Sequence, residues 1–275
     1  MRYKADIASV SVVLGTFALG LFPFIVPLPM WAFLIYIPVL LYGRSYCPYA
    51  QHNHGHLPVF YSPILNSIYN VFLTQTTGYP TALWELHHNR GHHRNFLTPE
   101  QDVARLIDLK TGKVVNRWWY ALRGNLTIHR DSFKIGIAEK RANKKSLLTK
   151  LNTEIAVQTI ITLGLFMWHP VLTLVCFVIP SFFTAWFIWW ESYQHHLHVE
   201  GETIYDASVT ITGKFFNLTT FNIGHHTAHH EKPTLHWSLL PQRTAAIRAK
   251  IPEQYVRPSR SKKWMKQNQQ DSMSA

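Results

Sequence analysis

The chain has 275 residues, of which 47% are hydrophobic and 15% are charged, and its formal net charge is +12. This length is enough for one large domain or two small ones. The only two cysteines are Cys47 and Cys176. They form no Cys-x-x-Cys pair, so a cysteine-based zinc or iron–sulfur site is excluded and a structural disulfide is not expected.

Residues 7–43 contain no Asp, Glu, Lys or Arg. One bilayer crossing needs about 20 apolar residues, so this stretch is too long for one span and predicts a hairpin of two spans. Pro23, Pro27 and Pro29 mark the turn, because proline interrupts a helix. The apolar run exceeds the roughly 7–15 residues of a signal-peptide core and lacks a small-residue cleavage site. A cleaved signal peptide is therefore not expected.

Residues 57–84 also lack formal charge, but they contain Asn, Gln, Ser and Thr throughout, as well as Pro63 and Pro80. This mixture predicts an interfacial or re-entrant helix rather than a fifth crossing. Histidine-rich segments lie on both sides of it, at 52–56 and 87–93. A crossing would place those segments on opposite faces of the membrane, where they could not share a site.

Residues 155–190 form a second uncharged stretch, broken at His169-Pro170. We predict a second hairpin here; a hairpin buried in a soluble helical protein is the alternative. The predicted fold is an all-α integral membrane protein with four spans in two transmembrane helical hairpins, roughly 7–43 and 155–190. A helical cap, made from 44–150 and 195–275, completes a single domain over residues 1–275 and holds a di-metal site.

The basic residues indicate the orientation of this fold. All 27 Lys and Arg lie outside the two hairpins, either at Arg2 and Lys4, within 44–150, or after His195. With four spans these regions face one side, which the positive-inside rule makes cytoplasmic. We therefore expect a multi-pass protein, of the inner membrane if bacterial, with the metal site and both termini in the cytoplasm. Anionic membrane lipids suit this charge, whereas a nucleic-acid partner would not explain the uncharged stretches.

Four short clusters hold 14 of the 17 histidines: HNHGH (52–56), HHNRGHH (87–93), QHHLH (194–198) and GHHTAHH (224–230). On a helix, residues three or four apart share a face. That spacing joins His52 to His56 and His88 to His92, with His93 beside them. The last cluster presents His226, His229 and His230 in the same way.

Converging imidazoles predict metal binding, since neutral imidazole is the commonest metal ligand near neutral pH. A single tetrahedral metal uses three or four ligands, so eight or nine well-spaced histidines indicate two metals, of a borderline kind such as iron, copper or zinc. Soluble di-iron bundles use two Glu-x-x-His motifs, whereas this spacing occurs only once in the sequence, at Glu85-x2-His88. Dispersed acids are expected to orient the imidazoles, namely Glu85, Asp102, Glu191 and Asp206.

These motifs and their order resemble the three histidine boxes of the integral-membrane fatty acid desaturase/hydroxylase superfamily, and its bacterial branch in particular. The boxes here are His52-x3-His56, His88-x3-His92-His93 and His226-x2-His229-His230. The family adds a ligand after its last span, which Gln194-His195 matches; His195 or the adjacent His196 can fill this role, as His87 can replace His88. The sequence departs from the family pattern at Glu191 and His225, and it has surplus histidines at 54, 87, 196 and 198.

The resemblance implies a non-haem di-iron oxidoreductase that uses O2 and acts on an unactivated C–H bond of a fatty acyl chain. Its nine metal ligands would be His52, His56, His88, His92, His93, His195, His226, His229 and His230. The substrate could be free, carrier-bound, linked to coenzyme A or linked to a lipid. The chain has no flavin, nicotinamide or four-cysteine motif, so a separate electron donor such as a ferredoxin, rubredoxin or cytochrome is implied, steered by basic residues such as Lys262 and Lys263.

A fatty acid desaturase is our first expectation, and a hydroxylase, an acetylenase and an alkene-forming decarboxylase of the same superfamily remain alternatives. A non-catalytic membrane metal or haem protein is an alternative of another class. Such a protein would hold facing histidines at mid-bilayer. Only His169 lies inside a predicted hairpin, and it lies at the turn.

Overall fold

The computed structural model describes residues 1–144, 146–197 and 199–258. These residues are mostly helical, as predicted, and the chain forms two compact units, Met1–Glu191 and Ser192–Ala275. The prediction of an all-helical chain misses one small element. Strands β1 (Thr210–Ile211) and β2 (Val256–Arg257) pair in parallel within the second unit.

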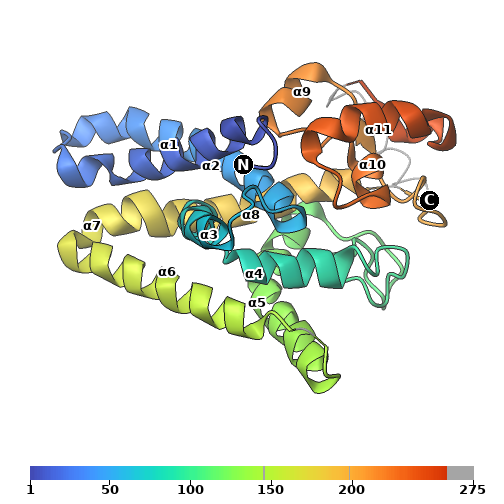
Figure 1. Ribbon diagram of the computed structural model, residues 1–275, viewed down its shortest axis with the longest axis horizontal. Coiled ribbons are helices and arrows are strands. Elements are labelled where there is room, and N and C mark those ends of the chain that lie inside the picture. The colour runs from blue at the N-terminus through green and yellow to red at the C-terminus, as the bar shows by residue number, and fades with distance from the viewer. Residues whose placement is uncertain (145, 198, 259–275) are drawn as a thin grey trace. The chain divides into compact units, whose positions relative to one another are not determined.

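The first unit begins with a helical hairpin. Helices α1 (Asp6–Ile25) and α2 (Phe33–His56) lie side by side, joined by a turn that contains η1 (Met30–Ala32) (Figure 1). Pro27 and Pro29 lie in the turn as predicted, but Pro23 lies inside α1. Proline near a helix end forfeits only one backbone bond, and α1 continues for two residues beyond it.

The segment after α2 does not form a membrane-length helix. Helix α3 (Pro63–Thr77) has 15 residues. It begins where the Ser62 hydroxyl accepts the Leu65 N–H, and it ends at Gly78, whose φ of 83° is easily adopted only by glycine. A short α4 (Thr81–Trp84) continues directly into η2 (Glu85–His92), which is a π-helical turn. This short, interrupted structure is what the polar composition of residues 57–84 predicts.

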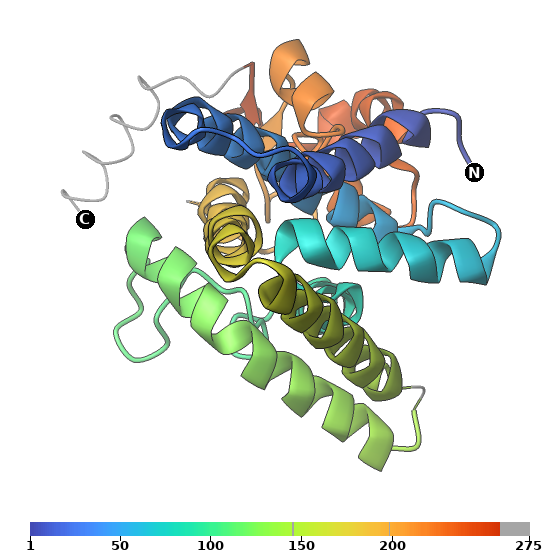
Figure 2. The same cartoon turned by 90° about the vertical axis from the view of Figure 1, so that its left-hand side faces the viewer.

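A long amphipathic helix and a second hairpin complete the first unit. Helix α5 (Arg117–Arg141) precedes α6 (Leu148–Trp168), and α3 packs against α6 (Figure 2). The chain turns at His169, whose ring accepts the Leu172 N–H, and continues through α7 (Pro170–Thr173), the π-helical η3 (Leu174–Val178) and α8 (Ile179–Ser192). The predicted turn at His169-Pro170 is therefore confirmed, although α6 starts seven residues before the uncharged stretch.

Three helices in the described part of the chain are long and apolar enough to cross a membrane: Asp6–Ile25, Leu148–Trp168 and the continuous segment Pro170–His195. Helix α2 is not among them; from Arg44 onward it contains Arg44 and several polar residues. The fourth span, and with it the two-hairpin topology, stays a proposal.

Arg44 ties the two hairpins of the first unit together. Its side chain is 1% exposed, and its guanidinium donates to the Thr76 carbonyl, the Ser181 hydroxyl and the Cys176 carbonyl, each at 3.0 Å. A charge buried among apolar helices is stable only when such acceptors surround it. The residue that ends the first uncharged stretch is therefore an internal cross-link.

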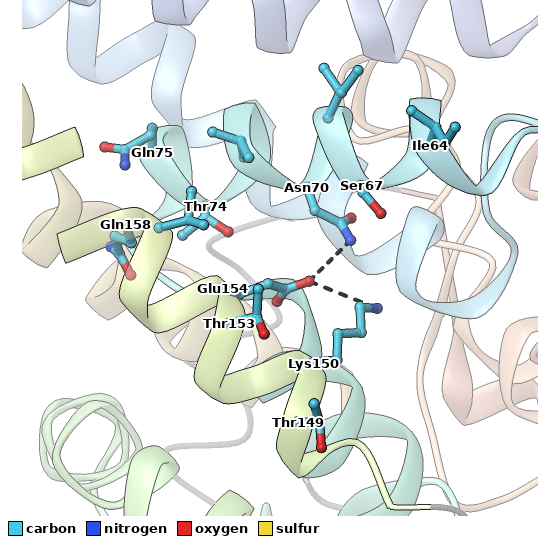
Figure 3. A pocket seen from close by; sticks show the side chains of 13 residues that line it. Ile64, Ser67, Asn70, Thr74, Gln75, Thr149, Lys150, Thr153, Glu154 and Gln158 are labelled. Carbon is cyan, nitrogen blue, oxygen red and sulfur yellow. Dashed lines mark hydrogen bonds and ion pairs between the residues drawn. The ribbon is translucent and has the colours of Figure 1, made fainter. Parts of the chain in front are cut away.

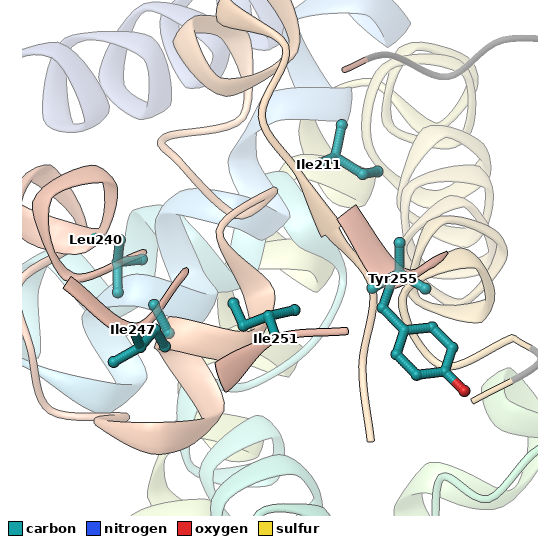
Figure 4. Packing of buried hydrophobic residues seen from close by; sticks show 7 residues of the cluster. Ile211, Leu240, Ile247, Ile251 and Tyr255 are labelled. Atoms are coloured by element: carbon teal, nitrogen blue, oxygen red, sulfur yellow. The ribbon is translucent and has the colours of Figure 1, made fainter. Parts of the chain in front are cut away.

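The second unit surrounds a compact apolar cluster. Its elements are η4 (Tyr193–His195), β1, α9 (Lys214–Thr219), α10 (His226–Glu231), η5 (Trp237–Leu239), α11 (Leu240–Ile247), η6 (Arg248–Lys250), η7 (Glu253–Tyr255) and β2. The cluster is formed by Val209, Ile211, Ala228, Leu240, Ile247, Ile251 and Tyr255 (Figure 4). Ala228 lies in α10, so this cluster also anchors the helix that carries the last histidines.

Gly124 provides a test of packing in the first unit. A Cβ atom at this position would lie 2.3 Å from the ring of Trp189, which is 3% exposed and belongs to α8. We expect Gly124→Ala to lower stability by about 1–3 kcal/mol through overpacking, measured as a lower thermal unfolding midpoint in detergent. Gly164→Ala is the matched control, since no atom lies within 4 Å of its Cβ position. Equal midpoints for the two variants would contradict the close contact.

Candidate metal centre

The first unit brings four histidines of two predicted boxes together. His52 and His56 lie on the last two turns of α2, His88 lies in η2, and His93 follows directly. One ring nitrogen from each of the four lies within 4.8 Å of those of the others. Nε2 of His88 is 3.1 Å from Nε2 of His93. We call this set the box 1–2 cluster.

The π-helical turn decides which rings of the second box meet. The backbone N–H of His93 donates to the His88 carbonyl at 2.8 Å, which is an i to i+5 bond. In an α-helix, His88 and His92 would share a face, as predicted from the sequence. A π turn contains one residue more between the two hydrogen-bonded groups than an α turn. His93, and not His92, therefore lies next to His88.

His92 points its Nδ1 toward a carboxylate. This atom is 3.0 Å from both carboxylate oxygens of Asp102, and both side chains are buried. Asp102 also accepts the Ala104 N–H at 2.8 Å, which fixes the carboxylate. A carboxylate on one ring nitrogen orients an imidazole so that the other nitrogen can bind a metal. The prediction that Asp102 orients a histidine is confirmed.

Neighbouring side chains hold the box 1–2 cluster in place. The indole of Trp84 stacks on His88 with 4.9 Å between ring centroids and 19° between planes. The amide of Asn89 donates to the Gly55 carbonyl at 2.9 Å, which joins η2 to the end of α2. The first contact restricts rotation of the His88 ring, and the second holds the backbone of η2 against the end of α2.

Two charged residues of α6 hold the start of the second box. The Glu154 carboxylate accepts the Ala82 N–H at 2.7 Å and the Asn70 amide at 3.0 Å. Lys150 forms an ion pair with Glu85, in the first turn of η2. Glu154 lies directly before the uncharged stretch 155–190, and this role was not predicted from the sequence. Its signal was an acid inside a helix that is otherwise long and apolar enough to span a membrane.

Burial favours the uncharged form of two imidazoles in this cluster. It lowers the pKa of His56 and of His88 well below the ordinary value, and the neighbouring histidines add to the shift. A neutral imidazole has a lone pair available for a metal, whereas an imidazolium has none. His56 and His88 are therefore in the protonation state that metal binding requires.

The second unit contains its own histidine group, formed by α10 and the segment after α8. Nε2 of His226 lies 3.1 Å from Nε2 of His196 and 3.2 Å from Nε2 of His230. His196 directs its Nδ1 to the Ala207 carbonyl at 3.0 Å. We call His196, His226 and His230 the box 3 cluster. Helix α10 ends at Glu231, and Lys232 caps it.

The remaining predicted ligands of this unit lie next to the box 3 cluster. The ring of His195 stacks on His226 with centroids 4.4 Å apart, and its Nδ1 has no hydrogen-bond partner among residues 1–144, 146–197 and 199–258. His229 is buried, with its ring centroid 5.6 Å from that of His226 and 5.7 Å from that of His230.

Three histidines outside the predicted ligand set, His54, His87 and His225, contact other kinds of side chain or backbone. His54 accepts the Val59 N–H, His87 meets Trp189 edge-on at 5.0 Å, and His225 pairs with the Thr244 hydroxyl at 2.9 Å. Burial lowers the pKa of each to about 4. His198, Lys262 and Lys263 lie outside the described residues.

The other acids predicted to orient imidazoles differ from Asp102. Glu85 pairs with Lys150, and Asp206 accepts the Thr203 N–H in a local turn. Glu191 is buried at the end of α8. Asp102 thus contacts a predicted ligand directly.

Both clusters have the chemistry of a metal site. Their donor atoms are imidazole nitrogens, the residues are buried or partly buried, and the closest nitrogens in each cluster are 3.1 Å apart. Two neutral imidazole nitrogens at this distance share at most one proton, so a common cation satisfies the remaining lone pairs better than another histidine can. An all-nitrogen set suits borderline divalent ions such as iron.

Comparison with protein families identifies the chain. The family model described as "Fatty acid desaturase" matches residues 25–261, which is most of the chain and includes all the histidine clusters. Comparison with individually curated proteins gives no match.

The Asp102–His92 contact generates a test of metal binding. Asp102→Asn removes the charge that orients His92, and we expect it to weaken metal binding by about 10–100-fold, measured by titrating the metal-depleted protein in detergent. Asp108→Asn is the matched control, because Asp108 lies in the same loop and also accepts backbone N–H groups but contacts no histidine that the structure describes. Unchanged affinity in Asp102→Asn would show that His92 needs no such orientation.

Proposed function

Because this chain belongs to the fatty acid desaturase family, whose members are enzymes, we propose that it is a membrane-bound, O2-dependent desaturase of fatty acyl chains. The observation that carries this proposal is the convergence of imidazole nitrogens from boxes one and two on one small volume, where burial lowers the pKa of His56 and His88. Three candidate membrane helices accompany the clusters, which suits an acyl substrate supplied from a bilayer.

We propose two irons per chain as the cofactor. His52, His56, His88 and His93 would hold one iron, and His226 and His230 would contribute to the second. His92 and His229 are the remaining proposed iron ligands of the three boxes. When bound, the irons supply the activation of O2 that removes hydrogen from an unactivated C–H bond. The protein supplies ligand orientation through Asp102, Trp84 and the α6 contacts, and burial excludes water from the imidazoles.

The ligand after the last span is proposed to be His196 in place of His195. His196 presents Nε2 to His226 while a backbone carbonyl faces its Nδ1, the arrangement that usually fixes the tautomer of a ligating histidine. His195 contacts the same group by stacking. From the sequence, either His195 or His196 could be this ligand. The geometry of their rings favours His196.

The substrate class follows from the family, which implies a fatty acyl chain. The electron donor is proposed to be a separate protein such as a ferredoxin, rubredoxin or cytochrome. We retain the predicted topology as part of the proposal: four spans, one functional domain formed by both compact units, and a cytoplasmic metal centre with both termini on the same side. The positions of the basic residues support this orientation.

The choice of ligand after the last span is tested with single substitutions. We expect His196→Ala to lose about half of the bound iron or more and all activity, whereas His195→Ala keeps measurable iron. Iron is measured by elemental analysis of monodisperse protein purified from iron-supplemented cells. The reverse pattern, with iron lost only from His195→Ala, would refute the choice of His196.

The proposed reaction is tested by product analysis. Membranes that contain the protein are incubated with isotopically labelled acyl substrates, O2 and a reductant, and the products are analysed by mass spectrometry. We expect loss of two hydrogens from the acyl chain, and no product from His93→Ala. His129→Ala is the control, since His129 is exposed on α5 and should leave activity unchanged. A product that gains oxygen or loses carbon dioxide would replace desaturation by hydroxylation or decarboxylation.

A further inference from the structure

A groove of about 690 Å³ lies between α3 and α6, and none of the proposed metal ligands lines it (Figure 3). Its volume is in the range of roughly 300–1,000 Å³ that is typical of small-ligand sites. The lining extends along α6 from Thr149 to Gln158, a length of about 14 Å at the α-helical rise. Figure 3 shows Asn70 and Thr74 pointing from α3 toward α6.

The rim of the groove is apolar and faces outward. Ile64 is 72% exposed and Ile68 is 49% exposed on α3, and both line the groove. On α6, Ile160 and Leu163 extend the exposed apolar surface beyond the groove. Since α6 is a candidate membrane span, this surface is where lipid chains would lie.

The inner end of the groove is polar. Thr74 and Gln75 are each 3% exposed, and neither the Thr74 hydroxyl nor the Gln75 amide nitrogen has a hydrogen-bond partner among residues 1–144, 146–197 and 199–258. Gln158 lies opposite them, at the midpoint of α6. Unpaired polar groups at membrane depth are costly. The Gln75 amide nitrogen can only donate a hydrogen bond and the Thr74 hydroxyl can also donate one, so an acceptor oxygen would satisfy both groups.

The charges at the other end of the groove limit what this acceptor can be. Glu154 and Glu85 lie around the single ammonium of Lys150, with Lys150 Nζ 3.9 Å from a Glu154 oxygen. A free carboxylate would meet two carboxylates and one cation that is already paired. An uncharged carbonyl on an apolar chain would meet no such repulsion.

From these observations we propose that the groove binds a membrane glycerolipid, with an ester carbonyl accepting hydrogen bonds from Thr74, Gln75 or Gln158 and an acyl chain along the apolar rim. Small rotations of these side chains, which line the groove, present their donors to the ester. This site does not depend on the metal clusters or on the proposed reaction.

Photolabelling of the purified protein in mixed lipid–detergent micelles tests the proposal. The probe is a diacyl phosphatidylcholine with a diazirine in one acyl chain, and labelled peptides are identified by mass spectrometry. We expect labelling of peptides from α3 and α6. Unlabelled diester phosphatidylcholine should compete about fivefold better than its diether analogue, the ratio expected for one net hydrogen bond.

Two variants and one control make the test specific. The triple variant Thr74→Val/Gln75→Leu/Gln158→Leu, which removes every proposed donor, should abolish the preference for the diester, and a monodisperse elution profile checks that it folds. Thr159→Val, at an exposed position of α6 outside the groove, should retain the preference. Val71→Trp should block labelling by filling the groove.

Four results would overturn the proposal: equal competition by the ester and ether lipids in the unmodified protein, an unchanged preference in the triple variant, labelling confined to other helices, or stronger competition by oleate or by a quinone. The readout needs neither iron nor turnover. An inactive protein with normal labelling would refute the proposed desaturation alone, and an active protein without labelling would refute this site alone.

Discussion

The structure depends on one constraint, that several imidazoles must lie together while they carry no charge. In the box 1–2 cluster, four rings from α2 and the second box share a volume a few ångströms across. Protonating His88 would place a cation among the other imidazoles of the cluster, which already lower its pKa. The helices that carry them therefore have to be fixed by contacts other than those of the rings themselves.

Those contacts come from polar residues at the ends of apolar helices. Arg44 joins the N-terminal hairpin to α3 and to the segment before α8, while Glu154 and Lys150 join α6 to the start of the second box. Each is a charged side chain next to a stretch of apolar sequence. Because such charges are expensive unless partners surround them, their partners define which helices pack together, and this positions the histidines.

The sequence predicted much of this arrangement and failed where local geometry decides. Uncharged stretches and the His169-Pro170 turn identified the helical hairpins, and repeated histidine spacing identified the clusters, because both features are visible directly in the sequence. The π-helical turn at Glu85–His92 is not visible there, since it differs from an α-helix only in its backbone hydrogen bonding. The same limit applies to Asp102, which is ten residues from His92 and was only one of four candidate acids, and to Glu154, whose partner Ala82 is 72 residues away.

The π-helical turn also limits how far the second box can be transferred to another protein. A designer who copied the letters HHNRGHH onto a regular α-helix would retain all four imidazoles but lose the i to i+5 bond at His93. Residues after the turn would then rotate by about 100°, the angle of one residue in an α-helix. His92, and no longer His93, would face His88, and Asp102 would have no ring to orient. The histidine motif can therefore be transferred to another protein only together with the π-helical turn that carries it.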